Sequence, residues 1–515
     1  MSRTRWLTLV VTTLVPCASA LGAEPDDGGV EEPSAGGSVG HAVEEASASE
    51  APAWKKVLEV TGYGDSRTSF TRSRTWGLVP TDDLPQLQEL FELNTQLRVK
   101  ASERSYMYSD VSLVANIAGQ YHGRDASGQD VQVANRAAVP VVSLNELYVF
   151  HDFVPQLNAV LGKKRIVWGS GLAFNPTDLL NPRRDPTDPT FQRAGAWVAQ
   201  LEAPFEKMTF SLLFAPTVLE STSSIPTAFM LYPSWDHQDS LVHYQLAARW
   251  YALVADADIT VMAFYGNSSV DVFRDKLRFG ASFSRYFFTD YELHFEAMFQ
   301  QGSARDSVVS QCVSSQSAAA LCALGGQAFF EKRRVGDTGV YPKVLVGTKR
   351  QFSDDSLISI EYLYQSDGWT KSQFQDFANG LGLIETGRQL GLPVQRVPGV
   401  SQLLGQSSSG DGLPTRFNFD PKGQHYLFLT AQKPRLFDDF TLQLVLLANL
   451  MALSTVWTPS VSWSATEWLT LTLYGFLPLP GPDALAPKTP GGTPVSEFGS
   501  SPFAVRAMLE ARAYF

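Results

Sequence analysis

The strongest constraint on this chain is an alternation of apolar and polar side chains that recurs in many segments. Between residues 91 and 101, every second position except Thr95 is apolar, as at Phe91 and Leu93, and the positions between them are polar, as at Glu92 and Arg98. Successive side chains of a β-strand point to opposite faces, whereas a helix repeats about every 3.6 residues. The alternation therefore predicts strands that each have one apolar face and one polar face.

Two neighbouring segments, residues 274–284 and 292–300, alternate in the same way on either side of a short polar turn at Thr289 and Asp290, which predicts a hairpin. Less regular runs occupy residues 55–70, 105–119, 141–153, 157–169, 191–204, 207–216, 241–254, 257–267, 339–351, 355–367, 423–432, 436–447, 451–462, 466–478 and 502–515. All these segments together predict an all-β fold of about 18 antiparallel strands.

The connections between the segments fall into two classes. Short ones lie at residues 101–104, 153–156, 203–206, 256, 289–290, 354–355, 434–435 and 465–466, and long ones lie at residues 120–138, 170–190, 217–240, 302–338, 368–422 and 479–501. Outer-membrane barrels have short periplasmic turns and long extracellular loops. We therefore expect a single transmembrane up-and-down β-barrel over residues 55–515, with lipid against its apolar faces. The alternative is a soluble sandwich or propeller, in which the apolar faces would be interior.

The first 54 residues differ from the rest of the chain. Arg3 and Arg5 precede an apolar stretch and a run of small residues, which is the order of a secretory signal peptide, so we expect residues 1–23 to be removed. Residues 24–54 contain acidic side chains but no Lys or Arg and show no periodicity. This composition predicts a disordered periplasmic leader, with a partner-binding tail as the alternative.

The last segment alternates up to Phe515. A final amphipathic strand that ends in an aromatic residue resembles the recognition signal of proteins inserted by the bacterial outer-membrane assembly machinery. Beyond the N-terminus no run of about 18 apolar residues occurs, so helical spans are not expected. These features predict a location in a Gram-negative outer membrane, with membrane lipid and the assembly machinery as partners.

If the apolar faces contact lipid, the polar faces line the lumen, because a charge facing hydrocarbon costs about 2–4 kcal/mol at the midplane. The candidate lumen residues are Arg98, Lys100, Arg249, Arg274, Lys276, Arg278, Glu292, His294, Glu296, Arg506 and Arg512. The basic run of residues 274–278 has two interpretations. Cross-strand ion pairs with Glu292 and Glu296 neutralise it, or it guides anionic or polar solutes, which predicts anion preference in planar-bilayer recordings.

Residues 165–186 read RIVWGSGLAFNPTDLLNPRRDP, and their Asn-Pro pairs and acidic side chains favour an ordered loop after a strand. The segment resembles porin-like outer-membrane proteins that carry an Arg-x-x-Trp-Gly strand end followed by an Asn-Pro-x-Asp-x-x-Asn-Pro loop. That resemblance implies a channel or transport role for small solutes. The density of turn-forming residues suggests a loop that folds inward and narrows the lumen, and a loop that stays at the rim is the alternative. The candidate constriction residues are Trp168, Asn175, Asp178, Asn181, Arg183, Arg184 and Asp185.

Other function classes have less support in the sequence. Cys312 and Cys322 are expected to form a disulfide in an oxidising compartment. Calcium at Asp178, Asp185 and Asp188 is an alternative whose spacing departs from a calcium loop, so no metal or cofactor is expected. The histidines are scattered without a hydrolase motif, so we expect no enzyme, and the formal net charge of -11 argues against nucleic acid. A plugged barrel whose large loops bind a partner or serve adhesion is the alternative to a channel.

Overall fold

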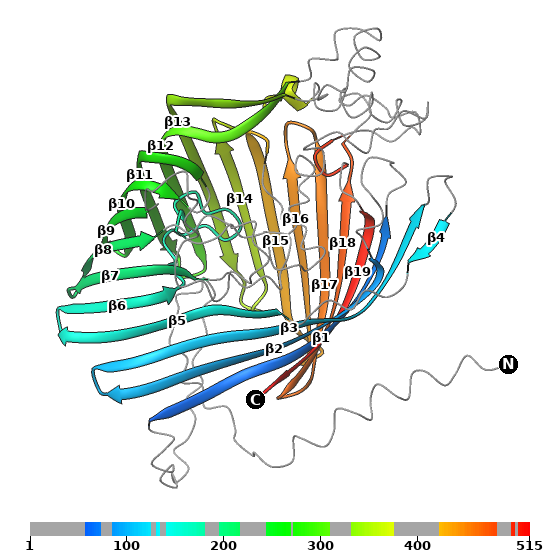
Figure 1. The fold of residues 1–515 in the computed structure, drawn as a ribbon, viewed down its shortest axis with the longest axis horizontal. Coiled ribbons are helices and arrows are strands. Elements are labelled where there is room, and N and C mark those ends of the chain that lie inside the picture. The colour runs from blue at the N-terminus through cyan, green and yellow to red at the C-terminus, as the bar shows by residue number, and fades with distance from the viewer. Residues whose placement is uncertain are drawn as a thin grey trace, which may run out of the picture. The chain divides into compact units, whose positions relative to one another are not determined.

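The computed structural model describes residues 57–73, 85–124, 130–133, 141–180, 195–216, 244–268, 271–309, 331–374, 422–481, 496–499 and 503–515. The described strands all lie within one compact unit, Ser47–Tyr514, and form one antiparallel sheet (Figure 1). Within the described residues, no helix is long and apolar enough to cross a membrane.

The strands in chain order are β1 (Leu58–Ser73), β2 (Pro85–Ser102), β3 (Ser105–Arg124), β4 (Asp130–Val133), β5 (Val141–Val154), β6 (Leu157–Lys164), β7 (Ala196–Pro204), β8 (Met208–Pro216), β9 (Tyr244–Val254), β10 (Ala257–Ser268), β11 (Asp271–Phe287), β12 (Tyr291–Val309), β13 (Glu331–Gln351), β14 (Leu357–Gln365), β15 (His425–Leu436), β16 (Phe440–Asn449), β17 (Ser454–Thr466), β18 (Leu469–Leu479) and β19 (Phe503–Tyr514).

The sheet closes on itself because β1 pairs with both β2 and β19. Asp65 of β1 lies opposite Glu92 of β2 on one side and opposite Arg512 of β19 on the other. Among the described strands β4 pairs with β3 alone, antiparallel to its last residues, and the other strands form a closed 18-strand barrel. Closure leaves no unpaired backbone edge in the wall, which is the condition for a sheet that crosses lipid.

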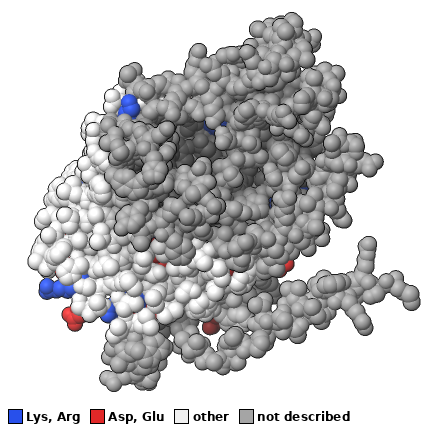
Figure 2. All heavy atoms as spheres, viewed as in Figure 1, with Lys and Arg blue, Asp and Glu red and all other residues white. Residues whose placement is uncertain are grey.

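The outer face of the barrel is apolar. Leu161 and Leu212 are 67% and 62% exposed, whereas their chain neighbours Val160 and Leu213 are each 3% exposed. Figure 2 shows a largely uncharged surface on the outer wall that faces the viewer, with charged side chains towards its edges. Soluble proteins rarely expose apolar surface on this scale, whereas a lipid-facing wall requires it. The fold is therefore a transmembrane β-barrel, and the soluble alternative is wrong.

The predicted strands all occur in the predicted order. The largest difference concerns residues 302–338, which were expected to form a loop. There β12 continues to Val309 and β13 begins at Glu331, so the two strands extend past the apolar belt. Strands outside lipid need no apolar face, and this is why the alternation gave no sign of them. β4 also lies inside an expected loop.

Several predicted boundaries are wrong, and three of them concern the end of a strand or the place of a turn. β6 ends at Lys164, so residues 165–169 do not continue the wall. Residues 434–435 are not a turn, because β15 runs on to Leu436 with an irregular register after Lys433 and a left-handed φ of 51° at Arg435. A proline without a backbone donor is accommodated at such an irregularity. The predicted turn at residues 465–466 likewise lies two residues early, at the end of β17.

The short connections lie together at one end of the barrel, here called the turn side, at residues 103–104, 155–156, 205–207, 255–256, 288–290, 352–356, 437–439 and 467–468. The opposite end is called the loop side. It also contains two short connections, residues 269–270 and 450–453, so not every connection on the loop side is long. The predicted signal peptide, the leader, Cys312 and Cys322 lie outside the described residues.

Candidate functional site in the barrel lumen

Residues 165–180 leave the wall after β6 and enter the interior of the barrel (Figure 1). Ile166 and Trp168 are 4% and 2% exposed, and they pack among inward-facing side chains that include Met262 and Phe264 of β10. The ring centroids of Trp168 and Phe264 are 5.6 Å apart. The part of the predicted constriction loop that the structure describes therefore lies in the lumen.

Glu296 of β12 fixes one half of this inward segment. Its carboxylate accepts a hydrogen bond from the backbone N–H of Gly171 at 2.6 Å and another from the hydroxyl of Thr177 at 2.9 Å. The backbone N–H groups of Ser170 and Thr177 donate to it as well. The side chain is completely buried. Because several donors converge on one charged acceptor, the contact is of the strong, charge-assisted kind.

Glu361 of β14 fixes the other half of the segment. Three successive backbone N–H groups donate to its carboxylate, those of Leu172, Ala173 at 2.9 Å and Phe174 at 3.2 Å. Glu361 has no exposed surface. The two wall carboxylates thus satisfy backbone donors that a loop inside a barrel would otherwise leave unpaired, at a cost in free energy.

Behind Glu361 the polar contacts continue along the wall towards the turn side. The His294 Nε2 lies 3.2 Å from Glu361, and its Nδ1 lies 3.5 Å from Glu292. Lys349 of β13 lies 3.9 Å from Glu292. Glu292 is therefore paired across the β12–β13 contact. The register places Arg278 of β11 opposite Gln300, so the basic run does not face Glu292 and Glu296 directly.

Two glycines allow the segment to turn inside the lumen. Gly169 has a φ of 114°, which side chains rarely adopt, and a Cβ there would overlap Asn175, Thr177 and Glu296. A Cβ at Gly171 would overlap the carbonyl oxygen of Phe174. The Trp-Gly-Ser-Gly sequence is therefore a packing requirement, since only glycine fits where the backbone comes this close to its neighbours.

A second segment, residues 496–499, also packs inside the barrel. Phe498 has no exposed surface, and the Glu497 carboxylate accepts hydrogen bonds from the Tyr426 hydroxyl at 2.7 Å, the Lys422 N–H at 2.9 Å and the Asn449 amide. Burial raises the pKa of Glu497, and these hydrogen bonds act against that shift. The segment is therefore tied to β15 and β16 through one carboxyl group.

Both segments rest on an apolar part of the inner wall. Phe174 and Phe498 pack with inward-facing side chains of β13 to β17, which include Leu345, Phe428 and Leu447. The expectation that inward faces are polar therefore fails on this side of the barrel. The reason is that the inner face there is covered by the chain itself and not by water.

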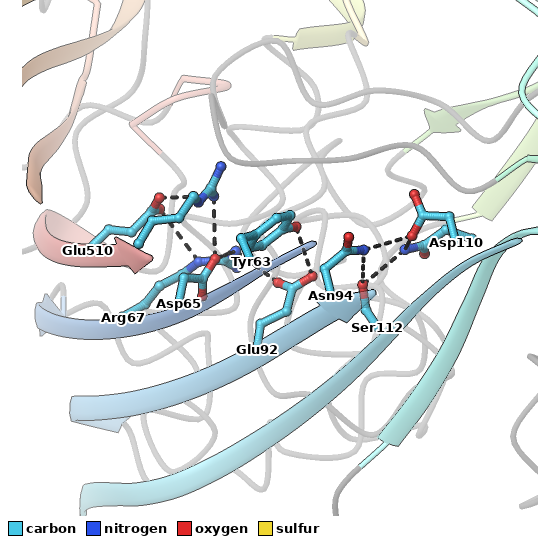
Figure 3. Close-up of polar contacts among 10 residues, drawn as sticks. Tyr63, Asp65, Arg67, Glu92, Asn94, Asp110, Ser112 and Glu510 are labelled. Atoms are coloured by element: carbon cyan, nitrogen blue, oxygen red, sulfur yellow. Dashed lines mark hydrogen bonds and ion pairs between the residues drawn. The ribbon is translucent and has the colours of Figure 1, made fainter. Parts of the chain in front are cut away.

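The inner face of β19, β1 and β2 is charged (Figure 3). The Arg67 guanidinium lies 2.6 Å from Asp65, 2.8 Å from Glu92 and 3.6 Å from Glu510. Arg512 adds ion pairs of 3.3 Å to Asp65 and 2.9 Å to Glu510. Three carboxylates thus share two guanidinium groups.

A second polar group, built around Asp110, adjoins this cluster on β2, β3 and β5. The side-chain amides of Asn94 and Asn145 both donate to Asp110, at 2.7 Å and 2.9 Å. Both also lie 3.0 Å from the Ser112 hydroxyl. Asn94 is completely buried, and Asp110 and Ser112 are each 2% exposed. The inner wall therefore carries a continuous polar face from β19 to β5.

The predicted lumen residues are divided between these regions. Arg278 has no exposed surface and donates to the Gly266 carbonyl at 3.0 Å, and the Arg249 guanidinium lies 5.9 Å from the ring centroid of Trp168. Both therefore lie on the side where residues 165–180 pack. Lys276 pairs in register with Gly266, and the side chain of Arg274 lies outside the described residues.

The other predicted basic residues belong to the polar face. Arg98 and Lys100 form ion pairs with Glu59, and the Arg98 guanidinium also lies 4.3 Å from the ring centroid of Tyr106. Arg506 donates to Ser69 at 3.4 Å. Of the predicted constriction residues, Asn175 accepts a hydrogen bond from Thr177, and the Asp178 N–H donates to the Asn175 carbonyl. Asn181, Arg183, Arg184 and Asp185 lie outside the described residues.

Several polar-face residues were missed by the sequence analysis, among them Asp65, Arg67, Asn94 and Asp110. Each lies in a predicted strand. The alternation of side chains between the two faces of a strand could therefore have predicted that they point inward. Their mutual contacts could not, because neighbouring strands pair in a register that the sequence alone does not specify.

The sheet is closed, its outer face is apolar, and its interior is shared between inserted segments and a polar wall. These features define the class of transmembrane β-barrel proteins. No protein-family model matches the chain, and no curated protein matches it either. Among solved structures it is similar to Pseudomonas aeruginosa OccK9 (OpdG), with 10% identity, a TM-score of 0.47, and 89% of this chain and 98% of that chain covered.

Two further structures have comparable coverage. Pseudomonas aeruginosa OccK8 (OprE) shares 10% identity at a TM-score of 0.44, with 89% of this chain and 98% of that one covered. A mutant of Rh. blastica porin shares 8% identity at a TM-score of 0.35, with 89% and 100% covered. Because these identities and TM-scores are low, the barrel fold is assigned from the strand pairing of this chain itself.

Proposed function

We propose that this chain is an outer-membrane channel for small polar solutes, with a passage narrowed by residues 165–180. The observation that supports this most directly is the division of the inner wall. Residues 165–180 and 496–499 pack on the apolar side, whereas β19, β1, β2, β3 and β5 turn hydrogen-bonding and charged groups inward. A wall of that polarity suits a water-filled path.

The same proposal includes the orientation and the route of assembly. The turn side faces the periplasm and the loop side faces outward, after removal of residues 1–23 and insertion by the outer-membrane assembly machinery through β19. Disulfide formation between Cys312 and Cys322 belongs to the proposal as well. The protein acts by passage and catalyses no reaction.

Planar-bilayer recording of the purified, detergent-folded barrel tests the proposal. Stepwise currents that disappear when the protein is unfolded by heat before addition are expected for a channel. Liposome swelling with neutral sugars of increasing size should then give a size limit. Absence of both currents and swelling from correctly folded protein would reject the channel and favour a plugged barrel that binds partners through its loops.

A further inference from the structure

Asp110 of β3 is a buried carboxylate with no basic partner among the described residues. Its polar contacts are the amides of Asn94 and Asn145, at 2.7 Å and 2.9 Å, and both of these are neutral. A buried charge that is hydrogen-bonded but not neutralised remains costly, and a cation placed beside it lowers that cost.

The neighbouring cluster does not supply that cation. Arg67 and Arg512 are shared by Asp65, Glu92 and Glu510, so those three carboxylates already outnumber the two guanidinium groups. Glu146, opposite Asp110 on β5, adds another carboxylate and lies 4.0 Å from Arg165. Neither the ion-paired cluster nor Glu146 therefore supplies a positive charge to Asp110.

A second observation points to a ligand at the same place. The side-chain oxygen of Asn94 is buried and has no hydrogen-bond partner among the described residues. One carboxylate oxygen of Asp65 is likewise buried and without a hydrogen-bond partner among them. The amide of Asn94 must present its nitrogen to Asp110, which leaves its oxygen as an acceptor. In Figure 3 this oxygen and the outer oxygen of Asp110 point to the same side, away from the strands.

We propose that Asp110 and Asn94, backed by the carboxylates of Asp65 and Glu92, form a transit subsite for a singly charged cation or for the cationic group of a passing solute. The subsite rests on the proposed channel function. It presents the Asp110 carboxylate, which only neutral amides contact among the described residues, beside the unpaired oxygen of Asn94. Acidic and carbonyl oxygens are the groups that select cations in channel walls. The described residues contain no group of three or more His, Cys, Asp or Glu side chains placed to hold a metal ion.

A cation subsite at Asp110 opposes the anion preference expected from the basic run of residues 274–278. Arg278 is completely buried and donates to Gly266, and Arg249 lies against Trp168, so neither presents its charge to the polar face. The charges of Arg278 and Arg249 are therefore held on the side of the barrel where residues 165–180 pack, away from Asp110.

The test is the reversal potential across a planar bilayer in a potassium chloride gradient, with potassium as the probe. Wild-type protein should prefer potassium over chloride, and Asp110→Asn should lower that preference by about twofold or more. An asparagine can still accept both amide hydrogen bonds through its carbonyl oxygen, so the wall contact is kept. The matched control is Asp439→Asn, which removes the same charge from an exposed residue of a turn and should leave the ratio unchanged.

The outcomes distinguish failure of the cation subsite from failure of the channel. Currents that prefer chloride, or a potassium preference that Asp110→Asn leaves unchanged, overturn the cation subsite but not the channel. If Asp110→Asn slows neutral xylose in liposome swelling as much as it lowers potassium preference, the residue acts on pore shape and the subsite is also rejected. Absence of any current from folded wild-type protein rejects the channel itself.

Discussion

The Glu361 carboxylate accepts a hydrogen bond from the Ala173 backbone N–H at 2.9 Å, across 188 residues of sequence. This contact joins the wall of the barrel to a segment inside it. Together with the contacts of Glu296, it makes the position of residues 165–180 depend on two carboxylates. Both are therefore direct targets for testing whether the segment narrows a passage.

Replacing Glu361 by Ala should release the inward segment and increase single-channel conductance. Each buried backbone donor that loses its partner costs about 1–3 kcal/mol, so the free energy that favours the docked segment over the released one decreases. The measurement is the conductance of single channels and its fluctuation. Glu202→Ala is the control, because Glu202 accepts from Ser211 on the wall of β7 and β8. Equal conductance in wild type and Glu361→Ala contradicts a constricting role.

Adding one methyl group at Gly171 should have a similar effect by sterics alone. The Cβ of Gly171→Ala would overlap the Phe174 carbonyl, so the segment must shift or leave its site. We expect noisier currents and a lower thermal midpoint, consistent with a destabilisation of about 1–3 kcal/mol. Gly64→Ala provides the control, since nothing lies within 4 Å of a Cβ at that position. An undisturbed Gly171→Ala protein would mean that the backbone there is differently placed.

A charge on the outer wall should impair folding according to its depth in the membrane. Leu212→Arg replaces a side chain of β8 that is 62% exposed towards lipid, and about 2–4 kcal/mol of folding free energy should be lost near the midplane. Phe437→Arg, at a turn where the side chain is 84% exposed, should cost about 0–1 kcal/mol. Denaturant titrations in lipid vesicles measure both. Similar costs for the two variants would argue against a lipid-facing wall.

The tie of residues 496–499 to the wall should weaken as pH rises. Burial raises the pKa of Glu497 above its ordinary value of 4.5, so the docked segment favours the protonated carboxyl. As pH increases from that ordinary value through the raised pKa, the undocked form gives up its proton first, and docking loses stability. Glu497→Gln should remove this dependence. From pH 4 upward, the thermal midpoint of the wild-type protein should fall relative to that of Glu497→Gln. Parallel curves for the two proteins would refute this pH dependence.

Much of the fold was predictable from the sequence because lipid acts on every second residue. The segment Phe91–Ala101 alternates with Thr95 as the one polar residue on its apolar face, and it lies within β2. Where strands leave lipid the rule fails, as in the extensions of β12 and β13. Pro434 was also misleading, because a residue typical of turns lies in an irregular stretch of β15.

The candidate site was predictable only in part. The turn-forming residues around Asn175 suggested an ordered segment, but nothing in the sequence distinguishes Glu296 and Glu361 from other inward carboxylates. Their role depends on which strands come to lie opposite the loop. Likewise Arg278 reads as a lumen charge from its alternation, yet packing over it removes it from solvent. Such features depend on three-dimensional proximity between distant segments.

The pairing of β1 with β19 has a consequence for biogenesis. Residues 58–73 cannot complete their hydrogen bonds until residues 503–514 are available, so the circular wall has a seam that joins its earliest and latest strands. Until that seam forms, both strands expose free backbone edges that can join another chain. Deleting β19 should therefore yield an open, self-associating sheet instead of a smaller pore.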